Sequence, residues 1–354
     1  MEYDNVFEHF AKKNNFIVLK TLGKGGFGVI KEIAIKGKIF AAKLTQKKDI
    51  NDFDQSEIIR DLRGPGIVKI IKDDQMKIGN LIYELVIMEK ANLKDLSKFI
   101  YFIYNKNLLN LIFKTPFEMI GDNLSRYFVK QILNGIKLLD MNNYIHFDIK
   151  PPNFLIFLEM VVKLIDFDLL RKTKIDANNN MKIPGGTKGY LSPEYYQYEG
   201  LVDEKTAKKQ DFFALGATIF FLKYGREMLE YTPFKEGLIT SDVLIELIEK
   251  SLDQIKTGTF SDKEFIDFLS SLIQYKPEQR PDFETIYRNK WVNKYSDEIE
   301  EIVEINKSNE EKLIIELNKS DFLIGKKKID NNNISNKKLK NNINRHKFIF
   351  IKKK

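Results

Sequence analysis

The sequence predicts an α+β protein of two lobes: a small β-rich N-terminal lobe with one main helix, and a larger, mostly helical C-terminal lobe. Residues up to about 89 alternate runs of β-branched and aromatic residues with turns, which is typical of a sheet. From Asn92 onward, apolar residues recur at helical spacing. A chain of 354 residues with 43% hydrophobic residues can bury one large core or two lobes that share a cleft.

The N-terminal lobe is predicted to hold a sheet and one helix. Residues 52–62 are predicted to form the helix, because Gly64-Pro65-Gly66 supplies a strong stop directly after it. Runs rich in β-branched and aromatic side chains predict strands at 16–19, 29–35, 39–44, 67–71 and 81–88.

The C-terminal lobe is predicted to be built on buried helices. Phe128, Ile132, Ile136 and Leu139 share one face of a helix predicted at 122–142. Further core helices are predicted at 210–224 and 262–275. A hairpin of two short strands is predicted at 154–157 and 161–165.

Composition excludes several kinds of site. The chain has no cysteine, which excludes disulfides, thiolate zinc sites and cysteine nucleophiles, and a reducing intracellular compartment is expected. Its three histidines are too scattered for a histidine metal centre. The acidic start predicts no signal peptide. The most apolar stretch, 99–113, is interrupted by Asn and Lys, so no transmembrane segment is expected.

Positive charge is concentrated at the C-terminal end. Residues 326–354 hold eleven Lys or Arg and one acid, so their net charge of +10 exceeds the +8 of the whole chain. This Asn/Lys-rich tail has few core formers and is predicted to be disordered, after an acidic helical extension at 293–325. Its basic clusters, 326–328 and 337–340, could act as a nuclear signal beside a cytoplasmic location, or contact nucleic acid or an anionic membrane surface. A solvated tail without a partner is the alternative.

A glycine-rich turn lies between the first two predicted strands, at Gly23-Lys24-Gly25-Gly26-Phe27-Gly28. Glycines let a backbone turn sharply and approach phosphate groups closely. A strand follows this turn, whereas a dinucleotide-binding Rossmann motif would continue into a helix. An ordinary glycine hairpin is the alternative, and the other motifs decide between the two.

The run from His146 to Asn153 carries the groups that phosphoryl transfer needs. That chemistry depends on positioning and charge neutralisation more than on covalent help. Asp148 could orient an attacking hydroxyl and accept its proton, Lys150 could offset phosphate charge, and Asn153 could offer an oxygen to Mg²⁺. Asp166 ends the predicted hairpin that follows, so its carboxylate can converge with Asn153 on one metal ion.

Together with Lys43 in Ala41-Ala42-Lys43, these fragments resemble the eukaryotic protein kinase family, serine/threonine type, with the subfamily unresolved. The resemblance implies a bilobal protein-kinase fold that transfers the γ-phosphate of Mg·ATP to a protein serine or threonine. It implies this division: an N-terminal extension at 1–15, a kinase domain at 16–292, lobes at 16–89 and 92–292, and an insertion at about 100–121.

The resemblance gives each site residue an expected role. Asp148 and Lys150 are the expected catalytic residues, and Asn153 and Asp166 the expected magnesium ligands. The residues expected to hold ATP are Leu22, Gly23, Lys24, Gly25, Gly26, Phe27, Gly28, Val29, Ile30, Ala41, Lys43, Glu89, Ala91 and Leu155.

The resemblance also implies structural roles. Glu194 should form a buried ion pair with Arg280, and Asp211 should hold the backbone of the catalytic loop. Thr187, like Lys150, fits the serine/threonine type.

The chain departs from the family in its activation segment. Phe147 stands where the family usually has an arginine that binds a phosphate on this segment. No Ser, Thr or Tyr lies between Asp176 and Gly186, and Thr173 is the nearest upstream candidate. An activation segment that needs no phosphorylation is therefore expected.

Two other departures affect the charges around Lys43. Asp168 replaces the glycine after Phe167, with an expected backbone strain of roughly 1–2 kcal/mol, and its charge could tighten or distort the magnesium site. The family register places the neutral Gln55 opposite Lys43, with Glu57 as the alternative. A glutamine would hold the lysine more loosely than a carboxylate. A pseudokinase or nucleotide-binding scaffold is thus the alternative to an active enzyme.

Overall fold

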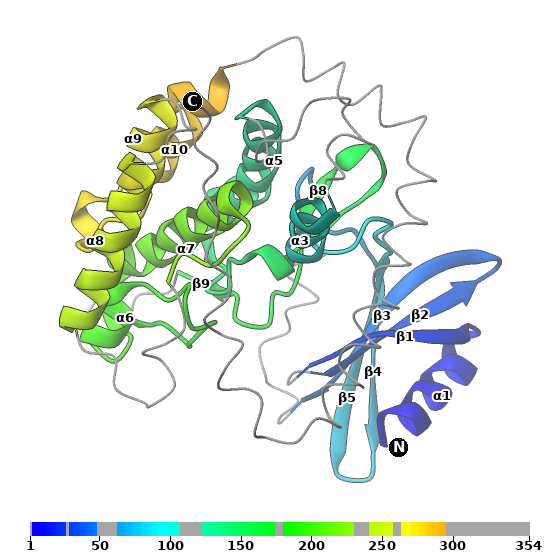
Figure 1. Ribbon diagram of the computed structural model, residues 1–354. Helices are drawn as coiled ribbons and strands as arrows, with labels where there is room; N and C mark the ends of the chain where they lie inside the picture. The colour runs from blue at the N-terminus through cyan, green and yellow to red at the C-terminus, as the bar shows by residue number, and fades with distance from the viewer. Residues whose placement is uncertain are drawn as a thin grey trace, which may run out of the picture.

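The computed structural model describes residues 2–25, 28–47, 62–106, 122–173, 180–229, 241–257 and 263–294. These residues form a β-rich N-terminal lobe and a larger, mostly helical C-terminal lobe (Figure 1). The predicted α+β fold of two lobes is therefore confirmed.

The N-terminal lobe contains a five-stranded antiparallel sheet with the strand order β1-β2-β3-β5-β4. All five strands were expected, although several of their ends differ from the predicted ones. They are β1 (Ile17–Gly25), β2 (Gly28–Ile35), β3 (Lys38–Lys47), β4 (Ile70–Ile78) and β5 (Leu81–Glu89).

Strand β4 differs most from its predicted range of 67–71. Ile67 and Val68 contact the other lobe instead: Ile67 forms an isolated bridge to Leu164, and the Val68 N–H donates to the Leu164 carbonyl over 3.1 Å. The strand itself runs on through residues 72–77, which are all polar except Met76. Because β4 lies at the edge of the sheet, it can expose polar side chains, and an apolar pattern does not mark it.

The two faces of this sheet have different surroundings. Val29 pairs with Leu44, and Ile30 pairs with Lys43. Because side chains alternate between the two faces along a strand, Val29 and Leu44 lie on one face and Ile30 and Lys43 on the other. Val29 and Leu44 are buried in a cluster with the N-terminal helix. Ile30 and Lys43 therefore lie on the face toward the C-terminal lobe.

The N-terminal helix, α1 (Glu2–Asn14), covers the outer face of the sheet (Figure 1). Its side chains Val6, Phe7 and Phe10 are buried there. The sequence predicted only an extension at 1–15, although this apolar spacing is that of an amphipathic helix. The N-terminal residues are therefore part of the packing of the N-terminal lobe.

The C-terminal lobe is mostly helical, with three small strand pairs, and the helix predicted at 122–142 is confirmed as α5. The helices are α3 (Leu96–Lys106), α5 (Asp122–Met141), α6 (Pro193–Gln197), α7 (Glu204–Tyr224), α8 (Ser241–Thr257), α9 (Lys263–Leu272), α10 (Phe283–Tyr287) and α11 (Lys290–Asn293). The strand pairs are β6 (Tyr144–Ile145) with β9 (Arg171–Lys172), β7 (Phe154–Ile156) with β8 (Val162–Leu164), and β10 (Asn180–Lys182) with β11 (Leu201–Asp203).

Helix α7 is the central helix of this lobe and begins earlier than predicted. The sequence predicted its start at residue 210, because the preceding residues are mostly polar. Its first residue is Glu204, since the carboxylate of Asp203 accepts the Thr206 N–H over 3.1 Å and caps the helix. The helix ends at Tyr224, and Gly225, whose φ of 66° is left-handed, caps it.

Several predictions fall outside the described residues. These are the helix at 52–62 except Leu62, the insertion beyond residue 106, and the C-terminal segments beyond residue 294. The apolar residues Ile100, Phe102 and Ile103, at the start of the predicted insertion, are buried in the core as part of α3. None of the described helices has the length and apolar character needed to cross a bilayer.

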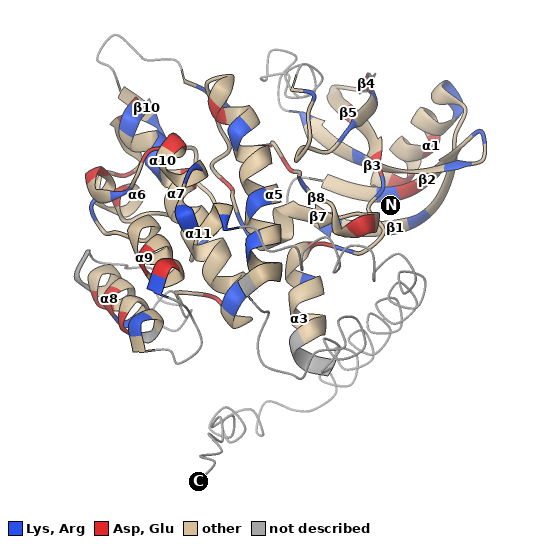
Figure 2. Ribbon diagram, turned by 90° about the horizontal axis from the view of Figure 1, so that it is seen from above, with Lys and Arg blue, Asp and Glu red and all other residues tan. Residues whose placement is uncertain are grey.

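Charges of both signs are interspersed over the helices of the C-terminal lobe (Figure 2). This distribution fits the sequence-based inference that the excess of positive charge belongs to the tail.

Candidate functional site

The loop that carries Asp148 is fixed to the C-terminal lobe by Asp211 of α7. The two carboxylate oxygens of Asp211 accept the backbone N–H groups of His146, over 2.7 Å, and of Phe147, over 2.9 Å. Burial raises the pKa of Asp211 to about 7, against the opposing effect of these two N–H donors. The predicted role of Asp211 is confirmed.

His146 connects this loop to the strand that leads to Asp166. Its Nε2–H donates to the Ile165 carbonyl over 3.1 Å, and its Nδ1 accepts the Asp148 N–H over 3.2 Å. Burial lowers the pKa of His146, although the nearby Asp148 and Asp166 oppose this shift. The neutral ring fits both bonds, since a protonated Nδ1 could not accept one. The ring also lies edge-on to Phe167, with 5.4 Å between centroids.

Asp148 is the centre of a hydrogen-bonded group of side chains. Its Oδ2 accepts from Asn153 Nδ2, over 2.9 Å, and lies 2.7 Å from Lys150 Nζ. Its Oδ1 accepts the hydroxyl of Thr187 over 2.8 Å. Lys150 also donates to this hydroxyl over 2.6 Å. A single hydroxyl group thus bonds to both the carboxylate and the ammonium group, which also contact each other.

The two expected magnesium ligands lie on neighbouring backbone. The hairpin of β7 and β8 brings them together, and the Ile165 N–H donates to the Asn153 carbonyl over 2.9 Å. The Asn153 amide nitrogen faces Asp148, so its side-chain oxygen is the atom available for a cation. Asp166 lies in the left-handed region, with φ of 64°. Two hard oxygen donors, one directly before β7 and one shortly after β8, fit a magnesium ion.

Lys43 reaches from β3 across to the C-terminal lobe. Its ammonium group lies 2.7 Å from Asp166 Oδ1 and 2.6 Å from Asp168 Oδ2. Burial would lower the pKa of Lys43, but the two carboxylates outweigh this effect and raise it. Burial and the nearby Asp166 raise the pKa of Asp168, against the opposing charge of Lys43. The sequence did not predict Asp168 as a partner of Lys43; the acid at a position usually held by glycine was the available signal.

The glycine-rich turn has two kinds of glycine. A Cβ on Gly28 would lie 2.1 Å from the Leu44 carbonyl oxygen, and its φ is 148°, so this glycine is required by strand packing. A Cβ on Gly23 or Gly25 would meet no heavy atom within 4 Å. These two glycines therefore face open space, as a loop over a ligand requires. Gly26 and Phe27 lie outside the described residues.

The other residues expected to hold ATP are placed on several elements. Leu22 and Lys24 are on β1 beside the glycines, Ile30 is on β2, Ala41 is on β3, and Leu155 is on β7. The Glu89 N–H at the end of β5 donates to the Lys69 carbonyl over 3.1 Å, so it is engaged in the sheet, and Ala91 follows shortly after. Val29 differs from the others, because its side chain is buried on the α1 side of the sheet, on the face opposite to Ile30 and Lys43.

The predicted structural ion pair is present. Arg280 and Glu194 form two parallel hydrogen bonds of 2.7 and 2.8 Å, and their side chains are 0% and 1% exposed. Arg280 also donates to three backbone carbonyls, those of Gln274, Lys209 and Tyr275. The pair therefore links the first turn of α6 to the segment between α9 and α10.

Phe147 packs against the activation segment. It is buried in an apolar cluster that contains Met181 and Ile183, which come from that segment. The cluster is completed by Ile145, Val202 and Ala207. Phe147, at the position where the family resemblance led us to expect an arginine, is thus held by apolar contacts.

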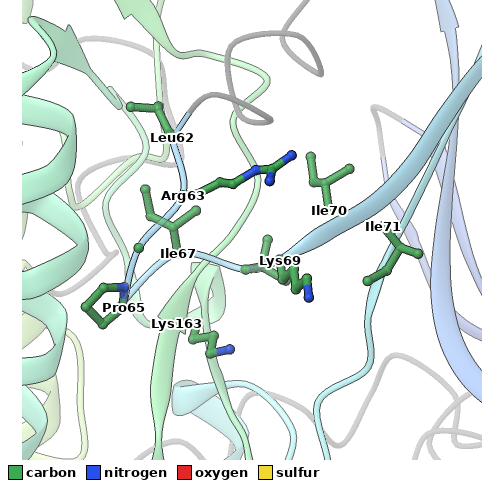
Figure 3. A pocket seen from close by; sticks show the side chains of 10 residues that line it. Leu62, Arg63, Pro65, Ile67, Lys69, Ile70, Ile71 and Lys163 are labelled. Carbon is green, nitrogen blue, oxygen red and sulfur yellow. The ribbon is translucent and has the colours of Figure 1, made fainter.

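A separate pocket lies outside this group of residues. It has a volume of about 620 Å³ and is lined by the loop at 62–67, the start of β4, and Lys163 of β8 (Figure 3). Of the residues expected to bind ATP, magnesium or the substrate hydroxyl, none that the structure describes lines it.

Comparison with known proteins identifies the family. The protein kinase domain model matches residues 16–292. The serine/threonine-protein kinase mrck-1 of Caenorhabditis elegans is 25% identical over 73% of this chain and 15% of its own length. The serine/threonine-protein kinase atg1 of Schizosaccharomyces pombe is 25% identical over 77% of this chain and 35% of its own length. The calcium/calmodulin-dependent protein kinase kinase cmkC of Emericella nidulans is 22% identical over 79% of this chain and 58% of its own length.

The chain thus spans between 15% and 58% of the length of these relatives. The family model covers most of the chain, and its limits enclose the Asp148 loop, the hairpin before Asp166 and Lys43. This protein belongs to the protein kinase domain family.

Proposed function

We propose that this protein is a serine/threonine protein kinase that transfers the γ-phosphate of ATP to a hydroxyl group of a protein substrate. The main support is the Thr187 hydroxyl between Asp148 and Lys150, with distances of 2.8 and 2.6 Å. An incoming serine or threonine hydroxyl needs the same surroundings: an acceptor for its proton and a cation beside the phosphate.

The proposed reaction assigns one task to each side chain. The substrate oxygen bonds to the γ-phosphorus, the bond from phosphorus to the oxygen bridging to the β-phosphate breaks, and the hydroxyl proton passes to Asp148. Lys150 offsets charge on the transferred group. Lys43 holds the remaining phosphates from the opposite lobe. Asn153 keeps Asp148 oriented through the 2.9 Å bond to its carboxylate.

Asn153 and Asp166 would hold the magnesium ion. When bound, magnesium neutralises phosphate charge and favours the departure of the leaving oxygen. The open space above Gly23 and Gly25 leaves room for the phosphates, and Ile30 and Ala41 line the face toward the nucleotide.

We also propose that the enzyme is active without phosphorylation of its activation segment. In related sequences an arginine beside the catalytic aspartate binds a phosphate on this segment. Here Phe147 packs on Met181 and Ile183, so burial of apolar surface supports the same docking. Phosphatase-treated protein should keep its activity. Met181→Asp should lower it at least tenfold, whereas Lys182→Asp at the exposed neighbour should change it little. Loss of activity after phosphatase treatment would contradict this proposal.

Transfer of labelled phosphate from ATP to a generic basic-protein substrate tests the main proposal. Asp148→Asn keeps the shape of the side chain and removes the proton acceptor, so the rate should fall on the order of 100- to 10,000-fold. Nucleotide binding should remain, because Asp148 is not expected to hold ATP. A wild-type protein that binds ATP but transfers no more phosphate than Asp148→Asn would be a pseudokinase.

The basic tail remains a separate prediction from charge alone. Residues 326–354 are proposed to add a weak, salt-dependent contact to nucleic acid or an anionic membrane, in the cytoplasm or nucleus. Filter binding of the full chain and of the chain ending at residue 325 tests this proposal. Binding that survives the deletion would exclude the tail as its cause.

A further inference from the structure

We propose that Asp168 is the positioning residue for Lys43, in place of the helix glutamate that kinases commonly use. This inference rests on the proposed function, because it concerns how the phosphate-binding lysine is held. The observation behind it is the 2.6 Å contact between Asp168 Oδ2 and Lys43 Nζ.

The division of charge explains why a second carboxylate matters. Asp166 is both an expected magnesium ligand and a partner of Lys43, at 2.7 Å. A carboxylate that turns toward a metal ion weakens its bond to a lysine. Asp168 is not needed for the metal, so it can keep the ammonium group in place while Asp166 serves the magnesium ion.

Burial makes the contact effective. The side chains of Lys43, Asp166 and Asp168 are 16%, 27% and 20% exposed. Charges in such partly buried places are screened less than surface charges. An ammonium group offers three N–H donors, so Lys43 can bind Asp168 and still donate to a phosphate.

The backbone also accommodates an acid at this position. A strained, left-handed conformation was expected for Asp168, but the left-handed residue of this segment is Asp166, and Asp168 is outside the set with positive φ. The backbone strain expected at Asp168 is therefore absent, because the left-handed conformation is taken by Asp166 instead. A side chain at 168 costs no backbone strain here.

The sequence supplies the reason for such a substitution. The register places the neutral Gln55 where a helix glutamate is usual. Loss of a carboxylate at one position and gain of a carboxylate at another would leave Lys43 with an ionic partner. Glu57 is the competing partner, and the experiment below separates the two.

The first test measures Lys43 without requiring catalysis. In the full-length protein without nucleotide, an amine-reactive reagent at fixed pH should label Lys43 about tenfold faster in Asp168→Gly than in wild type, because a charge-assisted bond is lost. Lys163, which is 2.7 Å from Glu89, is the internal control and should not change. Asp168→Glu should restore slow labelling. Unchanged labelling of Lys43 in Asp168→Gly would overturn the proposal even if the protein proved inactive.

The second test uses steady-state kinetics. Asp168→Gly should lower kcat about tenfold, because the bond that positions Lys43 is lost. The KM for ATP should change less than threefold, because loss of this bond weakens ATP binding while removal of the repulsion between Asp168 and the phosphates strengthens it. Gln55→Glu should recover activity in Asp168→Gly and add little to wild type. Glu57→Gln should be neutral. A loss of activity in Glu57→Gln with none in Asp168→Gly would assign the role to Glu57 instead.

Discussion

The protein contains two groups of charged side chains that differ in how their charges are matched. In the C-terminal lobe, Arg280 and Glu194 are fully buried, and the arginine also donates to three carbonyls. Between the lobes, the single cation Lys43 faces two carboxylates, Asp166 and Asp168, and all three are partly exposed.

The difference indicates what each group can do. A buried pair with matched charges and satisfied donors is a fixed structural link, because any change leaves an unpaired charge in the interior. An unmatched, partly open group can exchange partners, and a cation or a phosphate can enter it without leaving a charge unpaired. Substitutions in the first should therefore affect stability, and substitutions in the second should affect activity.

The largest expected effect is on the buried pair. Arg280→Met should lower the free energy of unfolding by about 3–5 kcal/mol, because Glu194 would remain buried without a partner. Urea denaturation at neutral pH measures this change. Arg280→Met combined with Glu194→Leu should recover part of the loss, because no charge is then left buried. A loss below about 1 kcal/mol in the single variant would mean that this pair behaves like a surface pair.

The next effect is on Lys43. Lys43→Met should lower the rate of phosphate transfer on the order of 100- to 1,000-fold, the range seen when one preorganised donor to a developing charge is removed. Its free energy of unfolding should change less than that of Arg280→Met, because Asp166 and Asp168 remain partly exposed to water. Lys163→Met offers a control in the same region. A large fall in stability with unchanged activity would reverse the contrast between the two groups.

Much of the fold could be predicted because it depends on local patterns. The helix at 122–142 and the hairpin that leads to Asp166 follow from apolar spacing. The full length of β4 and the start of α7 could not be predicted in this way. An edge strand tolerates the mostly polar residues 72–77, and one cap at Asp203 extends α7 through a polar turn.

The candidate site shows the same division. Asp148, Lys150, Asn153 and Asp166 could be found because their spacing matches a family motif. The partner role of Asp168 could not, because it depends on a contact between residues 125 positions apart. Val29 was assigned to the nucleotide by its place in the motif, whereas strand alternation turns its side chain toward α1.

A smaller effect is expected from His146, which lies beside both Asp148 and Asp166. Its pKa is lower in the folded protein than the ordinary 6.5, so the unfolded chain binds the proton first as the pH falls. Stability should therefore fall below about pH 6.5, by up to ~1.4 kcal/mol per pH unit. Urea denaturation between pH 7.5 and 5 measures this slope. His146→Phe should show a shallower slope, and an equal slope would assign the pH dependence to other groups.

The smallest effect is expected from an ion pair that holds α1 to the sheet. Lys13 lies 2.6 Å from Asp74, but its side chain is 50% exposed. Lys13→Met should change the free energy of unfolding by less than about 1 kcal/mol, and by even less in 1 M salt. Phe7→Ala, on the buried side of the same helix, should cost about 3–5 kcal/mol and be insensitive to salt. Comparable losses of stability in the two variants would show that the ion pair, and not apolar burial, attaches α1 to the sheet. A short distance between opposite charges would then predict stability by itself. The contrast between the two charged groups argues that burial is needed as well.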